Sequence, residues 1–198
     1  PILHDQLETL EHAMLAGFTH EPVVDLSERL SKRTGGSLGH CFYGSDGASA
    51  TEIALKMSFH YWRNRGQARK TRFVSLKGSY HGETLGAVSG TDVALFKDTY
   101  APLLRSSVQV QSPDWRLTEP GESPRDYAMR AARALTEHLE RHHEETAALI
   151  IEPLVQGATG MAMHDPAYLT EARRLCDLYE VHLIADEIMT GFGRTGTF

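Results

Sequence analysis

The chain opens with a helical pattern of apolar residues. Over the first sixteen positions they recur in steps of four, three and four, which places them on one face of a helix. These residues are Leu3, Leu7, Leu10 and Met14. Pro22 is placed to begin a second helix, because proline suits the first helical position. The expected buried side of that helix consists of Val23, Leu26 and Leu30.

From Cys41 onward the pattern alternates between strands and helices. Short apolar runs predict strands at 41–43, 72–76, 107–110, 147–151 and 181–185. A Ser-x-x-Glu capping box, Ser49 to Glu52, is expected to begin the first helix after Cys41. Its expected apolar face consists of Ala50, Ile53, Ala54, Met57 and Tyr61. Further helices are expected over 127–142 and after Asp165-Pro166, where an N-cap residue precedes a proline.

Continuous apolar strands of this kind suit a parallel sheet that is covered on both faces. The predicted fold class is therefore α/β, a mostly parallel, doubly wound sheet with flanking helices. Ligands in such sheets bind beyond the carboxyl ends of the strands. Candidate chemistry is therefore expected in the loops at 44–48, 78–83, 152–157 and 186–193.

Composition and charge exclude several classes of function. The 198 residues carry 26 acidic and 20 basic side chains, a net charge of −6. A surface broadly adapted to nucleic acid is disfavoured, because phosphate contacts need clustered Lys and Arg. No apolar run approaches the roughly 18 residues of a membrane span. Two distant cysteines, Cys41 and Cys176, form no disulfide framework, which favours a reducing cytoplasm.

The loop Gly44–Ser49 has the features of a phosphate cradle. Its small residues let a ligand approach the backbone, and the first N–H groups of the following helix are unpaired. A helix N-terminus also carries about half a positive charge. An ordinary tight connection with an N-cap would have the same sequence, so both interpretations stay open.

Asp186 directly follows an expected buried strand. Its carboxylate is costly to desolvate without a partner, so we expect a cation or a hydrogen-bond donor beside it. A solvated aspartate at the strand end is the alternative. A metal site is less favoured because no clear histidine ligand accompanies the carboxylates. His138 and His142 have zinc-compatible spacing, but their charge-dense segment is typical of a solvated helix face.

Two glycine-bounded loops complete the candidates. In Gly78–Glu83, Tyr80 could stack on a flat ring while His81 or Glu83 forms hydrogen bonds nearby. In Gly191–Gly196, Arg194 could bind a carboxylate. Both loops could equally be plain connections. Nucleophilic hydrolysis has no support, since the chain lacks a Gly-x-Ser-x-Gly elbow and neither cysteine has an adjacent activating histidine.

Taken in order, these segments resemble one known family. The carrying residues are FYGSDGASATE at 42–52, YHG at 80–82, IEP at 151–153, ADEI at 185–188 and TGFGRTG at 190–196. The chain resembles the class III (ornithine/GABA-type) aminotransferases across nearly its whole length. These enzymes use pyridoxal 5′-phosphate and have the type I aminotransferase fold. The resemblance therefore implies part of that fold's large domain.

Further stretches resemble one group within the family. They lie at 18–22, 54–57, 61–62, 75–86 and 91–97. Members of that group transfer the amino group of S-adenosylmethionine to 8-amino-7-oxononanoate, giving 7,8-diaminononanoate in biotin biosynthesis. Another class III transaminase that acts on an ω-amino acid or amine is an alternative. So is a non-catalytic phosphate-binding or assembly module that kept the scaffold.

The resemblance implies roles for individual residues at the cofactor. Backbone donors to its phosphate would come from Asp46, Gly47 and Ala48. Tyr80 would stack on one face of the pyridine ring and Ile188 would cover the other. Asp186 would pair with the ring nitrogen and keep it protonated, which makes the ring a strong electron sink. His81 would also belong to this cofactor-binding group.

Substrate contacts are implied as well. Arg194 would bind a substrate carboxylate, and Tyr80 and Glu83 would line the same pocket. Glu152 is expected to lie just behind the cofactor-binding residues. Family members are usually homodimers with sites at the subunit interface, so a homodimer is implied for the intact protein.

The family's Schiff-base lysine lies on a strand past the Asp-Glu segment, which would place it beyond Phe198. None of the lysines present, Lys32, Lys56, Lys70, Lys77 and Lys97, has the expected context. We therefore expect a fragment, with a helical segment over 1–18 and an incomplete cofactor-binding large domain over 19–198. It would lack the C-terminal domain and part of the N-terminal segment. Such a chain is expected to bind the cofactor weakly and to be unable to transaminate alone.

Overall fold

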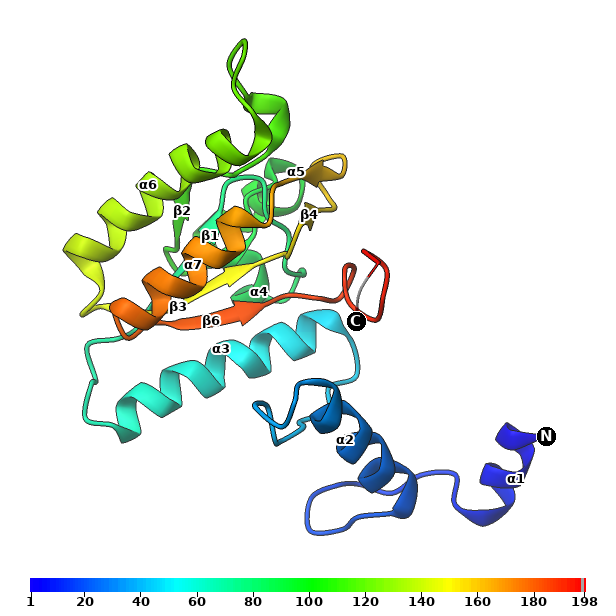
Figure 1. Ribbon diagram of the computed structural model, residues 1–198. Helices are drawn as coiled ribbons and strands as arrows, with labels where there is room; N and C mark the ends of the chain where they lie inside the picture. Colours follow the sequence, from blue (N-terminus) through cyan, green and yellow to red (C-terminus); the bar gives the residue numbers. More distant parts are fainter. Residues whose placement is uncertain (197) are drawn as a thin grey trace. The chain divides into compact units, whose positions relative to one another are not determined.

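The computed structural model describes residues 1–196 and 198 (Figure 1). The chain divides into two compact units, Pro1–Tyr43 and Gly44–Phe198. The first contains two helices, α1 (Ile2–Thr9) and α2 (Glu21–Arg33). The second contains the sheet and the remaining helices.

Helix α1 is shorter than the apolar pattern predicted. It ends at Thr9, where Leu10 turns to an extended conformation, and not near position 16. Every residue of α1 is at least partly exposed, and Leu3 and Leu7 are 80% and 62% exposed. The apolar residues of α1 are therefore not buried within this chain. A helix of eight residues with no side-chain N-cap has little intrinsic stability to extend it.

Helix α2 begins as expected, with Pro22 in its first turn, and His20 serves as its N-cap. The Nδ1 atom of His20 accepts a hydrogen bond from the Val23 N–H. The buried side expected for this helix is only half-buried, and Leu26 is 45% exposed. The Ser27 hydroxyl lies 2.7 Å from the Tyr43 hydroxyl and ties the helix to the end of its unit.

The predicted parallel sheet is confirmed. Its strand order is β2 (Val108–Val110), β1 (Arg72–Leu76), β3 (Thr146–Ile151), β6 (His182–Ala185). All three pairings are parallel. The chain moves from β1 outward to β2 and then returns to the other side of β1, so the strand order reverses between β1 and β3. In such sheets this switch point is where ligands bind.

The strand expected at Cys41–Tyr43 is wrong. These residues are irregular and belong to the first unit, and Phe42 is 69% exposed. Neither sheet of the described residues includes them, and without a hydrogen-bonded neighbour an extended run forms no strand.

Helices cover both faces of the sheet (Figure 1). Helices α6 (Pro124–His142) and α7 (Ala167–Leu178) lie on one face, and α3 (Gly47–Asn64) lies on the other. Side chains alternate between these faces along the strands, as in any pleated sheet. Those facing α6 and α7 form the main core: Val74, Leu76, Leu149 and Ile151 with Leu135, Leu139, Tyr168 and Leu175. Ser75 and Ile150 point to the α3 side, together with α3 residues such as Leu55 and Phe59.

Helix α3 begins two residues before the expected capping box. Asp46 is its N-cap, so Ser49 lies inside the first turn and is not itself the cap. The face of α3 that is buried is also not the apolar one, because it consists of Thr51, Ser58 and Trp62. The Trp62 Nε1–H donates to the Ala147 carbonyl at 2.8 Å, which holds this face against β3. The expected apolar face is partly exposed, with Met57 at 47% and Tyr61 at 43%.

Short elements connect these parts. They are α4 (Leu85–Gly90), α5 (Ala94–Lys97), the 3-10 helices η1 (Asp98–Leu103) and η2 (Trp115–Leu117), and the hairpin strands β4 (Val155–Gln156) and β5 (Ala162–Met163). The loops that follow β1, β3 and β6 hold most of the predicted site residues, and the start of α3 holds Asp46, Gly47 and Ala48.

Candidate functional site

A buried acid–histidine pair lies at the carboxyl ends of the strands. Asp186 follows β6, His81 follows β1, and their Oδ2 and Nδ1 atoms are 2.7 Å apart. Asp186 is only 8% exposed, which excludes the alternative of a solvated aspartate. Its other carboxylate oxygen accepts a hydrogen bond from the Ile188 N–H at 3.2 Å. The partner expected for this acid is therefore His81, although the sequence did not identify which donor would supply it.

The first turn of α3 contacts the segments that carry this pair. A Cβ atom added to Gly47 would stand 2.9 Å from Cδ1 of Ile188. One added to Gly82, which has a φ of +117°, would stand 2.7 Å from Cβ of Ala48. Both glycines therefore allow a close approach that a side chain would prevent. The loops that follow β1 and β6 meet the predicted phosphate cradle.

Asp46 closes the N-terminus of α3. Its Oδ1 accepts the Ser49 N–H at 2.8 Å, and its Oδ2 accepts the hydroxyls of Ser49 and Ser45. These bonds, the one from the Ser49 amide foremost, lower the pKa of Asp46. A carboxylate offers no proton to a phosphate, so Asp46 could contribute only its backbone N–H.

Tyr80 lies beside Phe96, a residue that the sequence motifs did not indicate. Its ring contacts Phe96, with centroids 5.1 Å apart. Its hydroxyl donates to Glu83 Oε1 at 3.1 Å. Burial and the Glu83 carboxylate both raise the pKa of Tyr80. Tyr80 and Glu83 thus lie together, and their place in a substrate pocket stays a prediction.

Glu152 joins two of the loops. Its Oε1 accepts the Tyr80 N–H at 3.0 Å and its Oε2 accepts the Gly157 N–H at 2.9 Å. Burial raises the pKa of this carboxyl. Glu152 therefore fixes the backbone directly before His81.

The hairpin formed by β4 and β5 is wedged between two site loops. A Cβ on Gly78 would stand 2.7 Å from Thr159 Cγ2, and a Cβ on Gly157 would stand 2.6 Å from Met189 Sδ. The tip of the hairpin therefore abuts the loop before Tyr80 on one side and the segment after Asp186 on the other.

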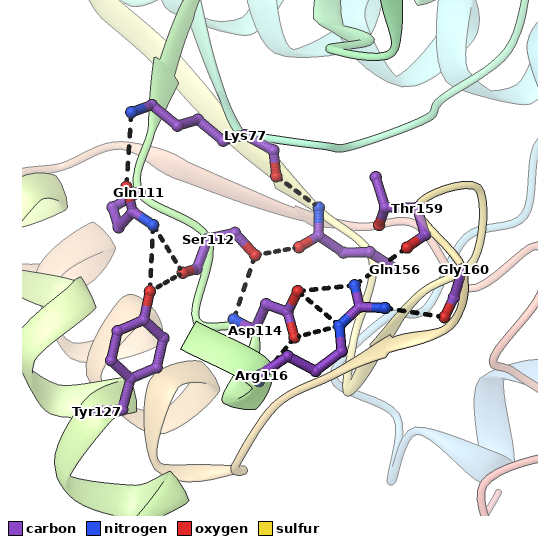
Figure 2. A network of polar contacts seen from close by, with 9 residues as sticks. All are labelled: Lys77, Gln111, Ser112, Asp114, Arg116, Tyr127, Gln156, Thr159 and Gly160. Atoms are coloured by element: carbon purple, nitrogen blue, oxygen red, sulfur yellow. Dashed lines mark hydrogen bonds and ion pairs between the residues drawn. The ribbon is translucent and has the colours of Figure 1, made fainter. Parts of the chain in front are cut away.

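Figure 2 shows the polar network that holds this hairpin. Arg116 forms a bidentate pair with Asp114 and donates to the Thr159 and Gly160 carbonyls. Gln156 accepts from the Ser112 hydroxyl and donates to the Lys77 carbonyl. Spacing could not reveal this network, because its members come from segments that lie far apart in the sequence.

Arg194 stays outside this group. Its side chain is exposed, and among the described residues it forms no hydrogen bond or ion pair with Asp186, Tyr80 or Glu83. Its backbone N–H donates to the Gly191 carbonyl, which closes a turn in the loop.

The described part of the chain has neither a cluster of metal ligands nor a helix suited to a membrane. Residues 1–196 and 198 contain no group of three or more His, Cys, Asp or Glu side chains that could hold a metal ion. In the same residues, no helix has both the length and the apolar character to cross a bilayer. His138 and His142 lie with ring centroids 5.1 Å apart on α6.

The comparison with known sequences gives a consistent result. The family model described as aminotransferase class III matches residues 1–198. The adenosylmethionine-8-amino-7-oxononanoate aminotransferase of Helicobacter pylori is 44% identical over 98% of this chain and 42% of its own length. The enzyme of the same name from Geobacter sulfurreducens is 40% identical, with 98% and 43% covered.

Solved structures agree. That of the adenosylmethionine-8-amino-7-oxononanoate aminotransferase from Methanocaldococcus jannaschii superimposes with a TM-score of 0.88 at 33% identity, covering 98% of this chain and 42% of its own. This chain thus spans less than half the length of the relatives that it matches. The resemblance predicted from the motifs is confirmed. The chain belongs to the class III aminotransferase family.

Proposed function

We propose that this chain supplies the cofactor-binding part of an aminotransferase that uses pyridoxal 5′-phosphate. In the intact protein it would transfer the amino group of S-adenosylmethionine to 8-amino-7-oxononanoate, giving 7,8-diaminononanoate in biotin biosynthesis. Class III aminotransferases depend on this cofactor, and the relatives named above carry the corresponding enzyme name. The observation that carries the proposal is the buried Asp186–His81 pair beside the first turn of α3.

The residues present fit the cofactor. The positive end of α3 and the amide N–H of Gly47 suit a phosphate. The buried Asp186 carboxylate suits a protonated ring nitrogen, because a buried charge needs a partner and an oxygen can accept more than one hydrogen bond. Ile188 lies two residues after Asp186 and approaches Gly47 closely. This contact supports a single site that binds the cofactor phosphate at α3 and the ring nitrogen at Asp186.

Each residue then has a distinct task. The bound cofactor would act as an electron sink that stabilises the substrate carbon after it loses a proton. Asp186 would hold a proton on the ring nitrogen, and His81 would orient Asp186 through its Nδ1 atom. Tyr80 and Ile188 would cover the two faces of the ring and exclude water from it. Glu152 would fix the loops that carry these side chains.

Substrate binding is proposed for three residues of the loops that follow β1 and β6. Arg194 would bind a substrate carboxylate, since a guanidinium pairs with it bidentately. Tyr80 and Glu83, already hydrogen-bonded to each other, would line the pocket. None of the five lysines of this chain has the context of the lysine that moves the substrate proton in this family. The 198-residue chain alone is therefore proposed to be inactive.

A second candidate is a class III transaminase that acts on an amine or ω-amino acid. It is favoured by the structure of an amine transaminase from an uncultivated Pseudomonas species in its PLP-bound form. That structure superimposes with a TM-score of 0.89 at 34% identity, over 98% of this chain and 44% of its own. A non-catalytic module is the third candidate. Homodimer formation and a cytoplasmic location stay predictions.

One experiment separates these candidates. The complete gene product that contains this chain is assayed with 8-amino-7-oxononanoate as acceptor and either S-adenosylmethionine or an ω-amino acid as donor. Turnover with S-adenosylmethionine supports the proposal, and turnover with only the second donor supports the alternative. A product without the lysine and without turnover favours the module. Turnover by the 198-residue chain itself would refute the proposed inactivity.

A further inference from the structure

A cavity of about 410 Å³ lies on the α3 side of the sheet. Helices α3 and α4, strand β1 and residues 105–107 line it. The exposed side chains of Lys56 and Arg105 stand among its outer residues. Its buried residues include Ser75, His81 and Ile150. The cavity therefore leads from the surface to the histidine that pairs with Asp186.

Two buried polar atoms in this cavity wall have no hydrogen-bond partner among residues 1–196 and 198. They are Oγ of Ser75 and Nε2 of His81. Both side chains are fully buried. The other ring nitrogen and the backbone N–H of His81 are occupied, since Nδ1 pairs with Asp186 and the N–H donates to the Thr91 hydroxyl. A buried polar atom without a partner is costly and rare in native proteins, so both atoms require one.

The chemistry of the cavity favours water as this partner. Cavities lined only by apolar atoms stay dry, whereas buried water occupies sites with several polar partners. Here the apolar side chains of Leu55, Phe59 and Ile150 stand beside the two unpaired polar atoms. A water molecule takes about 30 Å³ in the liquid, so the space is ample.

We propose that ordered water in this cavity hydrogen-bonds to Nε2 of His81 and to Oγ of Ser75. Ser75 is then a positioning residue that acts through this water on His81 and so on Asp186. By occupying Nε2, the water fixes the imidazole orientation that directs Nδ1 to the carboxylate. This role needs no bound cofactor. Only its consequence for the ring nitrogen rests on the proposed function.

The test uses two variants of the same shape. Ser75→Thr keeps a hydroxyl in β1, and Ser75→Val replaces it with a methyl group. The 198-residue chain, without cofactor and with 15N-labelled histidine, is studied by NMR for the His81 Nε2 signal and for magnetisation transfer from bound water. We expect the wild type and Ser75→Thr to show the water contact and the same Nε2 signal. Ser75→Val should lose the contact at least tenfold and shift the signal.

Several results would overturn the proposal. One is the absence of bound water at His81 in the wild type. Another is a matching response of the two variants, whether both keep the contact or both lose it, because the hydroxyl would then not matter. If neither variant folds, Gly90→Ala replaces them, since its methyl group would lie at an ordinary 3.6 Å from Cδ2 of His81. That variant should weaken the water contact, and an unchanged contact would contradict the proposal.

Activity of the complete gene product is measured separately. Absence of bound water at His81 in a wild type that does turn over would overturn the cavity proposal alone. Absence of turnover in the wild type bears on the proposed function alone. The two failures are therefore distinguishable.

Discussion

Ile188 covers Gly47 so closely that a Cβ atom there would stand 2.9 Å from the Ile188 Cδ1 atom and 3.2 Å from Cγ2. Gly47 is the first residue of α3, and Ile188 lies two residues after Asp186. The contact therefore joins the proposed phosphate site to the proposed partner of the ring nitrogen. A substitution at Gly47 or at Ile188 should therefore affect both parts of the proposed cofactor site.

We expect Gly47→Ala to weaken cofactor binding without unfolding the protein. Alanine is the better helix former by about 1 kcal/mol, so α3 should persist. The added methyl group must displace Ile188, and strain of this kind should reduce affinity about tenfold. Binding of pyridoxamine 5′-phosphate to the complete gene product, measured by calorimetry, checks this expectation.

A second substitution provides the control. Ile188→Val removes the Cδ1 atom, which is the atom nearest to the new methyl group. The double variant should therefore recover most of the lost affinity. Equal affinity in the wild type and Gly47→Ala would show that the contact has no part in binding.

Asp186→Asn is expected to reduce turnover by about a hundredfold or more, because a neutral amide would not stabilise a positive charge on the ring nitrogen. The control is Asp177→Asn, since Asp177 is exposed on α7 and pairs with Arg173. It should leave turnover within about threefold of the wild type. Steady-state kinetics of the complete gene product measure both. A fully active Asp186→Asn variant would exclude the assigned role.

The sheet could be predicted from the sequence because its strands are short continuous apolar runs. β1 begins and ends as expected, and β3 starts one residue early. The error at α3 has a physical reason. The helix packs on the sheet with Thr51, Ser58 and Trp62, so its most apolar face is not its buried face.

The sequence predicted which four loops carry the candidate site. It did not predict which side chains in those loops contact one another. Glu52 illustrates the limit. The spacing to Ser49 indicated a capping box for its own helix, yet its Oε1 accepts the Gly86 and Ala87 N–H groups and caps α4. The partner of Asp186 was equally hidden, since His81 lies 105 residues earlier in the chain.

The network in Figure 2 gives another prediction. Arg116→Ala removes the hydrogen bonds to the Thr159 and Gly160 carbonyls, so the hairpin tip should loosen. Amide exchange at 157–160 is expected to become about tenfold faster. Arg173→Ala is the matched control, because its ion pair with Asp177 on α7 is exposed. Unchanged exchange at the hairpin would mean that Arg116 does not hold it.

Stability should depend on the protonation of buried histidines. Burial lowers the pKa of His164, and it also lowers the pKa of His138 and of His182. The unfolded chain therefore binds these protons more tightly than the folded chain. The free energy of unfolding should fall as the pH decreases through about 6.5, the ordinary value for histidine. Glu152 acts in the opposite sense, because its raised pKa removes stability as the pH rises above its ordinary value.

Comparing two variants isolates the contribution of His164 to the pH dependence of the free energy of unfolding. His164→Gln keeps a donor for the Glu152 carbonyl, which His164 Nε2 now approaches at 3.2 Å. Urea unfolding between about pH 5 and pH 8 should show a smaller loss of stability toward acid in this variant than in the wild type. His60→Gln, at an exposed position of α3, should follow the wild-type curve. Parallel curves for His164→Gln and the wild type would mean that burial of His164 does not couple folding to its protonation.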